Sequence, residues 1–342
     1  MIEIIVEIDK EGIMMNIQEL EKRIKLPEAA GKAVDQIKIT EAEYQEQKQI
    51  FDRNLEEFID KWKNRENKYE WALKFYLMLC CETYEVYKEK GIAGEIFDKT
   101  FYDITIWCEE CYRKYQIYGL EEIGWIAQSV KMNLFRLGRL QFEPYILKEN
   151  LKCKSGILKR GTEVLNVHIP AGEPLDHEKC LESFKMAEYF FEDDSKRHIY
   201  MCDSWLLSPR LKEVLGEESN ILKFQDMFEI VKVYETYPQA EQRVFLDVKK
   251  DKQQYPEDTG LRKKLKKYLI EGKNPGIGVG IIEKIYKFIE IIYVFLTIFL
   301  YLLKCPQSFI LSALRAFCFC CKPHISRSIF LYFLYQTWLK SW

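Results

Sequence analysis

The hydrophobic periodicity of this chain changes near residue 150 from a helical to a strand period, and this change constrains the fold most. Within residues 97–115 the apolar side chains follow a 4-3-4-3-4 spacing, which places them on one face of a helix. Residues 163–169 instead alternate between two faces, as in a strand. The sequence therefore predicts an α+β protein in which an all-helical part precedes a mixed α/β part.

The predicted elements fill both parts. A short strand is expected at 2–8, followed by helices over 15–25, 41–65, 67–90, 97–115 and 120–137. Later strands are predicted over 163–169, 198–206, 229–236, 242–248 and 276–282. Helices are predicted between them, beginning at Asp176, near 209, at Ser219 or Asn220, and at Asp258 or Thr259. We expect a helical domain over 1–148 and a sheet domain with helices on its faces over 149–282.

Charge is unevenly distributed along the chain. The tail after residue 283 has seven Lys or Arg and one Glu, and removing these from the totals of 51 and 53 leaves 44 basic and 52 acidic residues. The body therefore has a net charge of about −8, which argues against nucleic acid as a partner because phosphate binding needs a positive surface. The first residues lack the basic and apolar regions of a signal peptide, so we expect a cytoplasmic body with reduced thiols.

The C-terminal tail, residues 283–342, is hydrophobic and basic. Residues 285–304 approach the length of about 20 residues that a transmembrane helix needs, although Lys287 and Glu290 lie near one end. Further apolar stretches continue to residue 339, and we expect a helical tail. Three interpretations stay open: membrane association through 285–339, a core or partner-binding helix, and an aberrant extension.

A metal site is not expected. Cys108 and Cys111 have the spacing of half a zinc site, but the body contains no second Cys-x-x-Cys pair. Both residues also fall on the apolar stripe of the helix predicted over 97–115, so we interpret them as core residues.

Candidate catalytic residues lie at the ends of two predicted strands. His168 precedes the Ile-Pro break after 163–169, and it is a candidate general base because its ordinary pKa is near neutrality. The alternative is that its ring holds the following loop. Asp203 and Ser204 interrupt an otherwise apolar strand, so they are candidates for catalysis or for hydrogen bonds that fix the strand.

Candidate binding residues follow in the last third of the sequence. Ser219 and Asn220 begin a helix, where they can cap it or bind an anion. Gly276 and Gly278 belong to a glycine-rich stretch that lacks the Lys-Ser/Thr of a phosphate loop, which favours a strand at a sheet edge that allows close backbone approach. The basic helix over 262–267 is either a solvated face or a surface for coenzyme A phosphates or anionic lipid.

Several of these segments resemble a known family. The motifs are Gly-Leu-Glu-Glu-Ile-Gly-Trp at 119–125, Leu-Phe-Arg-Leu-Gly-Arg-Leu-Gln-Phe-Glu at 134–143, His-Ile-Pro at 168–170, Cys-Asp-Ser-Trp-Leu-Leu at 202–207, Ser-Asn-Ile at 219–221 with Phe-Gln at 224–225, Asp-Thr at 258–259 with Leu261, and Gly-x-Gly at 276–278. They are similar to bacterial acyltransferase-domain proteins, which have a helical N-acyltransferase N-terminal domain and a GNAT-like C-terminal domain. The resemblance covers about 1–282.

The resemblance implies transfer of an acyl group from acetyl-CoA or another acyl-CoA to an amine on a small molecule or peptide. It implies a split sheet that admits the thioester and backbone amides that hold the pyrophosphate. His168 or Asp203 would be the base, Trp205 a wall of the acyl or acceptor pocket, and Ser219 with Asn220 a polar anchor. The usual pyrophosphate loop of the superfamily is not recognisable, so the rival hypothesis is a catalytically degenerate binding module. Arg136 and Arg139 are expected to pair with acids across the junction between the domains.

Overall fold

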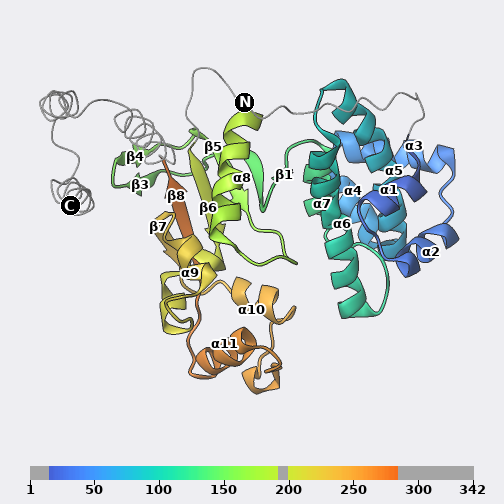
Figure 1. The fold of residues 1–342 in the computed structure, drawn as a ribbon. Helices are drawn as coiled ribbons and strands as arrows, with labels where there is room; N and C mark the ends of the chain where they lie inside the picture. Colours follow the sequence, from blue (N-terminus) through green and yellow to red (C-terminus); the bar gives the residue numbers. More distant parts are fainter. Residues whose placement is uncertain (1–14, 192–198, 284–342) are drawn as a thin grey trace, which may run out of the picture. The chain divides into compact units, whose positions relative to one another are not determined.

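The computed structural model describes residues 15–191 and 199–283 (Figure 1). The strand expected at 2–8 lies outside these residues, as does the tail after residue 283 with its candidate membrane segment 285–304. Among the residues that are described, none of the helices combines the length and the apolar character that crossing a bilayer requires.

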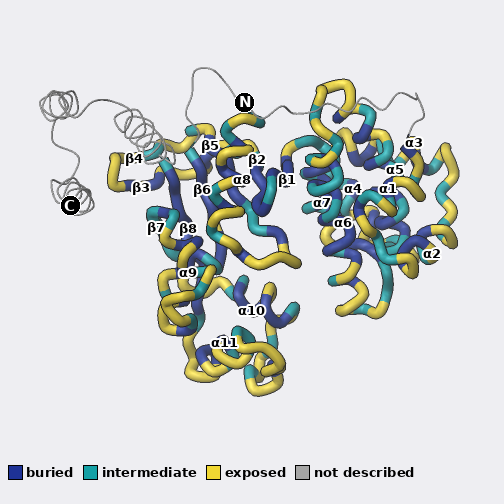
Figure 2. The backbone as a smooth tube through the Cα atoms, in the orientation of Figure 1, coloured by how far each residue is buried: buried dark blue, intermediate teal, exposed yellow. Residues whose placement is uncertain are grey.

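The first part of the described chain is helical, and its helices bury aromatic and aliphatic residues. Figure 2 colours the buried positions of these helices dark blue. Its elements are α1 (Ile17–Arg23), α2 (Glu28–Gln36), α3 (Glu41–Arg53), α4 (Leu55–Lys63), α5 (Lys68–Glu89), α6 (Gly94–Tyr115) and α7 (Ile123–Val130). The stripe predicted over 97–115 is confirmed, since Phe97, Phe101, Ile104, Cys108 and Cys111 are all buried on α6.

The helix predicted over 41–65 is divided at Asn54. The backbone of Asn54 is extended (φ −153°, ψ 98°), and its side chain accepts hydrogen bonds from the backbone N–H groups of Glu56 and Glu57. Asn54 therefore ends α3 and caps α4. An Asn side chain competes well for backbone groups in this way, whereas the apolar stripe continues through the break and hides it.

The helix predicted over 120–137 is wrong in its second half. α7 ends at Val130, and Met132 then adopts a left-handed backbone (φ 57°). The chain continues as a hairpin of β1 (Phe135–Leu137) and β2 (Leu140–Ile146), with Gly138 at φ 71° in the turn. Leu134 and Leu137 are buried as expected, but a short apolar run cannot distinguish a helix from a strand that is covered on both faces.

The hairpin begins a six-stranded sheet of order β1-β2-β5-β6-β8-β7. Its other strands are β5 (Glu163–His168), β6 (Tyr200–Ser204), β7 (Glu229–Tyr234) and β8 (Ile277–Ile282). Neighbouring strands run antiparallel except β5 and β6, which run parallel. A helical part followed by a mixed α/β part was predicted, and this is confirmed for the described residues.

The sheet splits between its two parallel strands. β5 and β6 pair only at Leu165 with Tyr200 and at Asn166 with Met201. Beyond this point β5 remains paired with β2 as far as His168, and β6 remains paired with β8 as far as Ser204. The carboxyl-terminal ends of β5 and β6 therefore separate, and we call this separation the fork.

The two faces of the sheet have different coverings. Helix α8 (His177–Phe190) packs on one face, where the rings of Phe142, Phe184 and Tyr200 contact one another edge to face. On the other face a separate hairpin, β3 (Leu151–Cys153) and β4 (Gly156–Leu158), shares a buried cluster with β5, β6 and β8. The sequence did not predict this hairpin.

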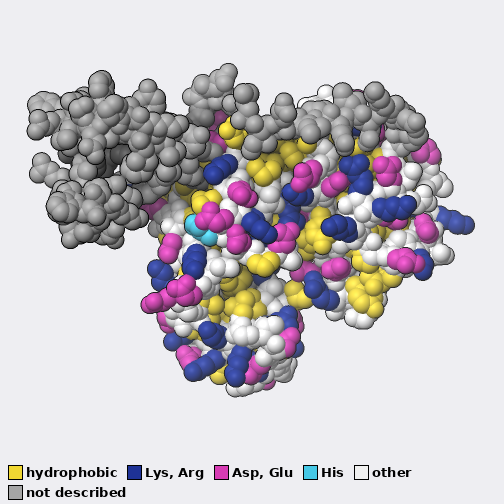
Figure 3. All heavy atoms as spheres, in the orientation of Figure 1, with side chains coloured by type: hydrophobic (Ala, Val, Ile, Leu, Met, Phe, Trp, Pro, Cys, Tyr) yellow, Lys and Arg dark blue, Asp and Glu magenta, His cyan; other side chains and the backbone are white. Residues whose placement is uncertain are grey.

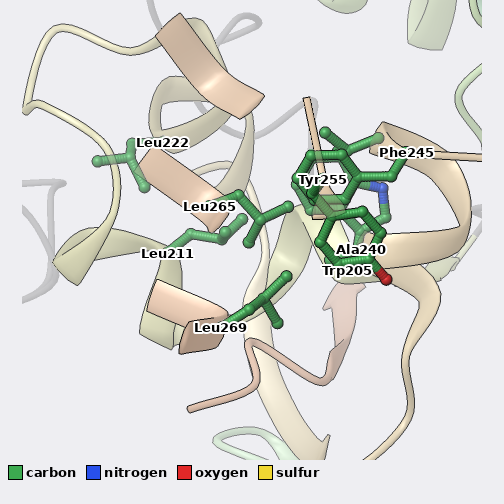
Figure 4. Close-up of a cluster of buried hydrophobic side chains, with 9 residues drawn as sticks. Trp205, Leu211, Leu222, Ala240, Phe245, Tyr255, Leu265 and Leu269 are labelled. Carbon is green, nitrogen blue, oxygen red and sulfur yellow. The ribbon is translucent and has the colours of Figure 1, made fainter. Parts of the chain in front are cut away.

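The strand predicted over 242–248 is also wrong, because helix α10 (Gln239–Val244) occupies its first residues. Ala240 and Val244 lie one turn apart on α10 and both enter a buried cluster (Figure 4). The cluster also draws side chains from η1 (Trp205–Leu207), η2 (Pro209–Glu213), α9 (Asn220–Gln225) and α11 (Gly260–Ile270), and the short η3 (Lys252–Gln254) leads to its Tyr255. The i, i+4 spacing of Ala240 and Val244 therefore determines a helix here, although residues 242–248 were predicted as a strand.

Candidate active site

Polar side chains gather on one face of the sheet beside the fork. Residues that pair across strands share a face, and the register pairs Gln141 with His168 and Glu143 with Asn166. The pairing of Asn166 with Met201 places Asp203, two residues further along β6, on the same face. We call these five residues, Gln141, Glu143, Asn166, His168 and Asp203, the polar patch.

The centre of the polar patch is a hydrogen bond between His168 and Glu143. Nε2 of His168 lies 2.9 Å from Oε2 of Glu143, and Nδ2 of Asn166 donates to the same oxygen at 3.2 Å. Both His168 and Glu143 are partly covered, with side-chain exposures of 21% and 23%. An ionised carboxylate only accepts, so neutral His168 carries its proton on Nε2 and keeps a lone pair on Nδ1. Burial alone would raise the pKa of Glu143, but the hydrogen bonds from His168 and Asn166 outweigh burial and lower the pKa.

Asp203 stands on the other side of the fork from His168. Asp203 is exposed to solvent, but the protein atoms around its carboxylate still desolvate it in part and raise its pKa, with His168 opposing the rise and Glu143 adding to it. The predicted candidates His168 and Asp203 are therefore brought onto one face, with Glu143 as a second carboxylate.

The helical part supplies a further side chain to this site. The ring of Trp125, on α7, contacts the imidazole of His168 edge to face, with centroids 4.8 Å apart. Nε1 of Trp125 donates to Oδ2 of the buried Asp103 on α6 at 2.9 Å. Sequence reasoning gave Glu143, Trp125 and Asp103 no role, because strand register and packing between distant helices bring them to His168.

Ser204 and Trp205 lie away from the polar patch. Ser204 faces the opposite side of β6 from Asp203, and its hydroxyl accepts from Leu206 N–H and caps η1. Trp205 is buried in the cluster of Figure 4, and its backbone N–H donates to Gln239. Both contacts are structural, so the roles predicted for Ser204 in catalysis and for Trp205 in a pocket stay predictions.

The Ser219–Asn220 pair caps α9. The hydroxyl of Ser219 accepts from the backbone N–H of Ile221, and Asn220 is exposed as the first residue of the helix. Helix capping accounts for this pair, and its predicted role as a polar anchor stays a prediction.

The glycine stretch is a strand, as predicted, but it is not at a sheet edge, since β8 lies between β6 and β7. A Cβ on Gly278 would stand 2.1 Å from the carbonyl oxygen of Leu207 in η1. A Cβ on Gly276, where φ is 71°, would stand 2.2 Å from the carbonyl oxygen of Tyr234. Both glycines therefore allow backbone segments to pack directly on one another, and their predicted role in binding a cofactor stays a prediction.

Two arginines from the β1–β2 hairpin hold the loop that follows His168. Arg136 is buried and forms an ion pair with Glu173 at 2.7 Å. Both residues lie in the sheet part, so this pair does not join it to the helical part as predicted. Arg139 forms no ion pair with an acid within residues 15–191 and 199–283, where one was predicted; it donates to the carbonyl oxygens of Pro170, Glu173 and Pro174. Burial lowers the pKa of Arg139, and three carbonyl acceptors suit its planar fork of donors.

The remaining motifs have ordinary surroundings. Cys108 and Cys111 are buried on α6, and burial raises the pKa of each thiol to about 12. No cluster of three or more His, Cys, Asp or Glu in the described ranges is arranged to hold a metal ion. On α11, Arg262 pairs with Asp258 and Lys266 with Glu257. The face shown in Figure 3 intermixes Lys and Arg with Asp and Glu.

Comparison with known families defines the class of protein that this fold and site represent. Residues 15–132 match the family model of the N-acyltransferase N-terminal domain, and residues 134–282 match that of the GNAT-like C-terminal domain. The chain therefore contains both of these domains, one after the other, as the resemblance implied. None of the curated proteins compared with the chain matches it significantly.

Solved structures support the same fold. The chain is similar to an acyltransferase in complex with decanoyl-CoA and teicoplanin, with a TM-score of 0.63 and 20% identity over 78% of this chain and 87% of that one. A mutant acyltransferase in complex with octanoyl-CoA gives a TM-score of 0.62, and an acyltransferase in complex with CoA and 10C-teicoplanin gives 0.63, both at the same identity and coverage.

Proposed function

We propose that this protein is an acyl-CoA-dependent N-acyltransferase that transfers an acyl group to an amine. The observation that carries the proposal is the fork, with His168 and Asp203 on one face beside it and Glu143 bound to His168. A parallel strand pair that separates exposes backbone groups on two facing edges, and these groups fit the amides of an extended pantetheine arm.

The proposed chemistry follows from the orientation of His168. Glu143 holds Nε2–H, so Nδ1 accepts a proton from the amine while the amine nitrogen attacks the thioester carbonyl. The new C–N bond forms, the C–S bond breaks, and the proton passes from the imidazolium to the departing thiolate of CoA. Glu143 and Asp203 stabilise the transient positive charge on His168. Asp203 is the alternative base, since its pKa is raised.

The proposed acyl donor is an acyl-CoA and the acceptor is an amine on a small molecule. Structural neighbours of this chain were solved with octanoyl-CoA, decanoyl-CoA and teicoplanin. A peptide amine is the second acceptor to test. The acidic body of the chain favours an acceptor that arrives as an ammonium ion, which releases one proton to solvent before the free amine attacks.

The test combines binding with turnover. Calorimetry with acetyl-, octanoyl- and decanoyl-CoA measures donor binding, and release of CoA thiol in the presence of an amine panel measures transfer. We expect His168→Gln to lower kcat/KM by about 10²- to 10⁴-fold, with donor affinity unchanged. Asp60→Asn, at an exposed acid on α4, is the control and should keep full activity.

Two results would reject the proposal. If His168→Gln and Asp203→Asn both keep full turnover, the site is assigned wrongly. If the wild-type protein binds none of the three acyl-CoA compounds, the rival hypothesis of a catalytically degenerate binding module is favoured instead.

A further inference from the structure

A buried carboxylate in the helical part has no role in the chemistry proposed above. Asp103 lies on α6 and is 2% exposed. Its Oδ2 accepts two hydrogen bonds, from Nε1 of Trp125 at 2.9 Å and from Nε2 of Gln141 at 2.7 Å. One oxygen of Asp103 thus joins α7 to β2.

Both donors lead to the same residue, His168. The ring of Trp125 contacts the imidazole edge to face, with an interplanar angle of 77°. Gln141 pairs directly with His168 in the register of β2 and β5. The imidazole is therefore held at Nε2 by Glu143 and at its ring by Trp125, whose own orientation depends on Asp103.

Stability alone does not explain a carboxylate at this position. Burial raises the pKa of Asp103 despite the hydrogen bonds from Gln141 and Trp125, so the charged form is disfavoured in the folded protein. A hydrogen bond between uncharged groups already joins α6 to the sheet, because Thr100 Oγ1 accepts from the backbone N–H of Arg136. A buried carboxylate is therefore not needed to hold α6 against the sheet. A residue that weakens the fold locally at such a position is typical of a functional site.

We propose that Asp103 is a positioning residue, which fixes Trp125 and through it the ring of His168, so that Nδ1 faces the incoming amine. This inference rests on the function proposed above. It assigns the helical domain a direct part in the reaction, because α6 and α7 set the orientation of a base that β5 carries.

The kinetic test uses four variants of the full-length protein. Asp103→Leu removes both acceptor bonds, and Trp125→Phe removes only the indole donor while a ring remains. We expect each to lower kcat by about 10- to 100-fold, with the Kd for octanoyl-CoA within about twofold of wild type. Asp103→Asn keeps an acceptor oxygen and should stay within about fivefold of wild-type kcat. The control, Asp98→Leu, removes an acid of α6 that bonds Arg23 within the helical part and should leave kcat unchanged.

The double variant separates positioning from general damage. If Asp103 acts through Trp125, the combined variant should lose no more activity than the worse single variant, because both changes break the same hydrogen bond between Asp103 and Trp125. Losses that multiply would overturn the inference, as would an Asp98→Leu variant that loses as much kcat as Asp103→Leu. Should Asp103→Leu not fold, Trp125→Phe should still lower kcat while Asp103→Asn, which keeps the acceptor, stays near wild type; a wild-type kcat in Trp125→Phe would then overturn the inference.

NMR of the His168 imidazole tests the positioning role of Asp103 without depending on enzyme activity, so a failure of this inference can be told apart from a failure of the proposed function. The chain has four histidines, so the imidazole NMR signals of His168 can be assigned by their loss in His168→Gln. Asp103→Leu should displace these signals, because the ring of Trp125 would change its position over His168. If the wild-type protein shows no transferase activity but Asp103→Leu still displaces the His168 signals, the proposed enzymatic function is rejected and the contact between Trp125 and His168 is supported. Unchanged signals and kcat in an active protein would reject the role of Asp103.

Discussion

Replacing Gly278 with Ala should damage the fold, because this glycine lies where η1 touches β8. The added Cβ would stand 2.1 Å from the carbonyl oxygen of Leu207 and 2.5 Å from its carbonyl carbon. A carbon–oxygen contact needs more than 3 Å, so β8 and η1 must separate by roughly 1 Å. Both sides of the contact are backbone, and no side-chain rotation relieves it.

The expected cost is about 3 kcal/mol, at the upper end of the usual range for overpacking. Urea unfolding followed by circular dichroism would measure this cost as a midpoint lowered by about 1.5 M, for a denaturant slope of roughly 2 kcal/mol per M. Gly280→Ala should cost less, since its new Cβ would meet side-chain atoms of Leu207 and Phe228 at 2.8 Å. Gly260→Ala is the matched control, because nothing lies within 4 Å of the added Cβ.

The outcome distinguishes two roles for Gly278. If the Gly278→Ala midpoint equals that of Gly260→Ala, the close approach of η1 does not constrain this strand, and the reasoning is refuted. If Gly278→Ala in addition unfolds normally but no longer binds octanoyl-CoA, the predicted binding role is correct and the structural role is wrong.

Three further predictions concern charged groups around the fork, each measured by chemical denaturation. Because the folded pKa of Glu143 is lowered, Glu143→Gln should cost about 1–2 kcal/mol at pH 7; this difference should begin to decrease at the ordinary value of 4.5 and vanish once pH falls below the lower folded pKa. The pKa of Asp203 is raised, so Asp203→Asn should gain roughly 0.5 kcal/mol at pH 7 after allowance for solvent screening, and nothing below pH 3.8. Arg139→Lys should cost about 2 kcal/mol, because an ammonium group cannot reach three carbonyl oxygens together; a stability equal to wild type would contradict this.

The sequence predicted the elements whose side chains repeat with one clear period. The helical part, the strand at 163–169 and the helix after Asp176 follow from the spacing of apolar residues and from a capping residue that accepts from Lys179 N–H. The β1–β2 hairpin and α10 were missed, since their apolar residues fit both periods. The left-handed backbone of Gly138 allows the hairpin turn, and Val244 packs into the buried cluster of which Figure 4 is a close-up. These two features determine the structure of the segments, and neither follows from the local period.

The candidate site was predictable only in part. His168 and Asp203 stood out as polar residues at strand ends, and the structure brings them onto one face. Glu143 could not be paired with His168 from the sequence, because 25 residues separate them and the contact depends on the register of β2 and β5. The approach of Trp125 depends on helix packing that no local pattern encodes.

The adjacent polar residues Asp203 and Ser204 of β6 have different roles. Successive side chains of a strand face opposite sides, so Asp203 joins the polar patch whereas Ser204 caps η1. A slip of one residue would exchange the two and remove a carboxylate from beside His168. The pairing of Ser204 with Gly278 sets this register, and Gly278 allows η1 to lie directly on β8. Gly278 therefore supports the proposed chemistry through the placement of Asp203.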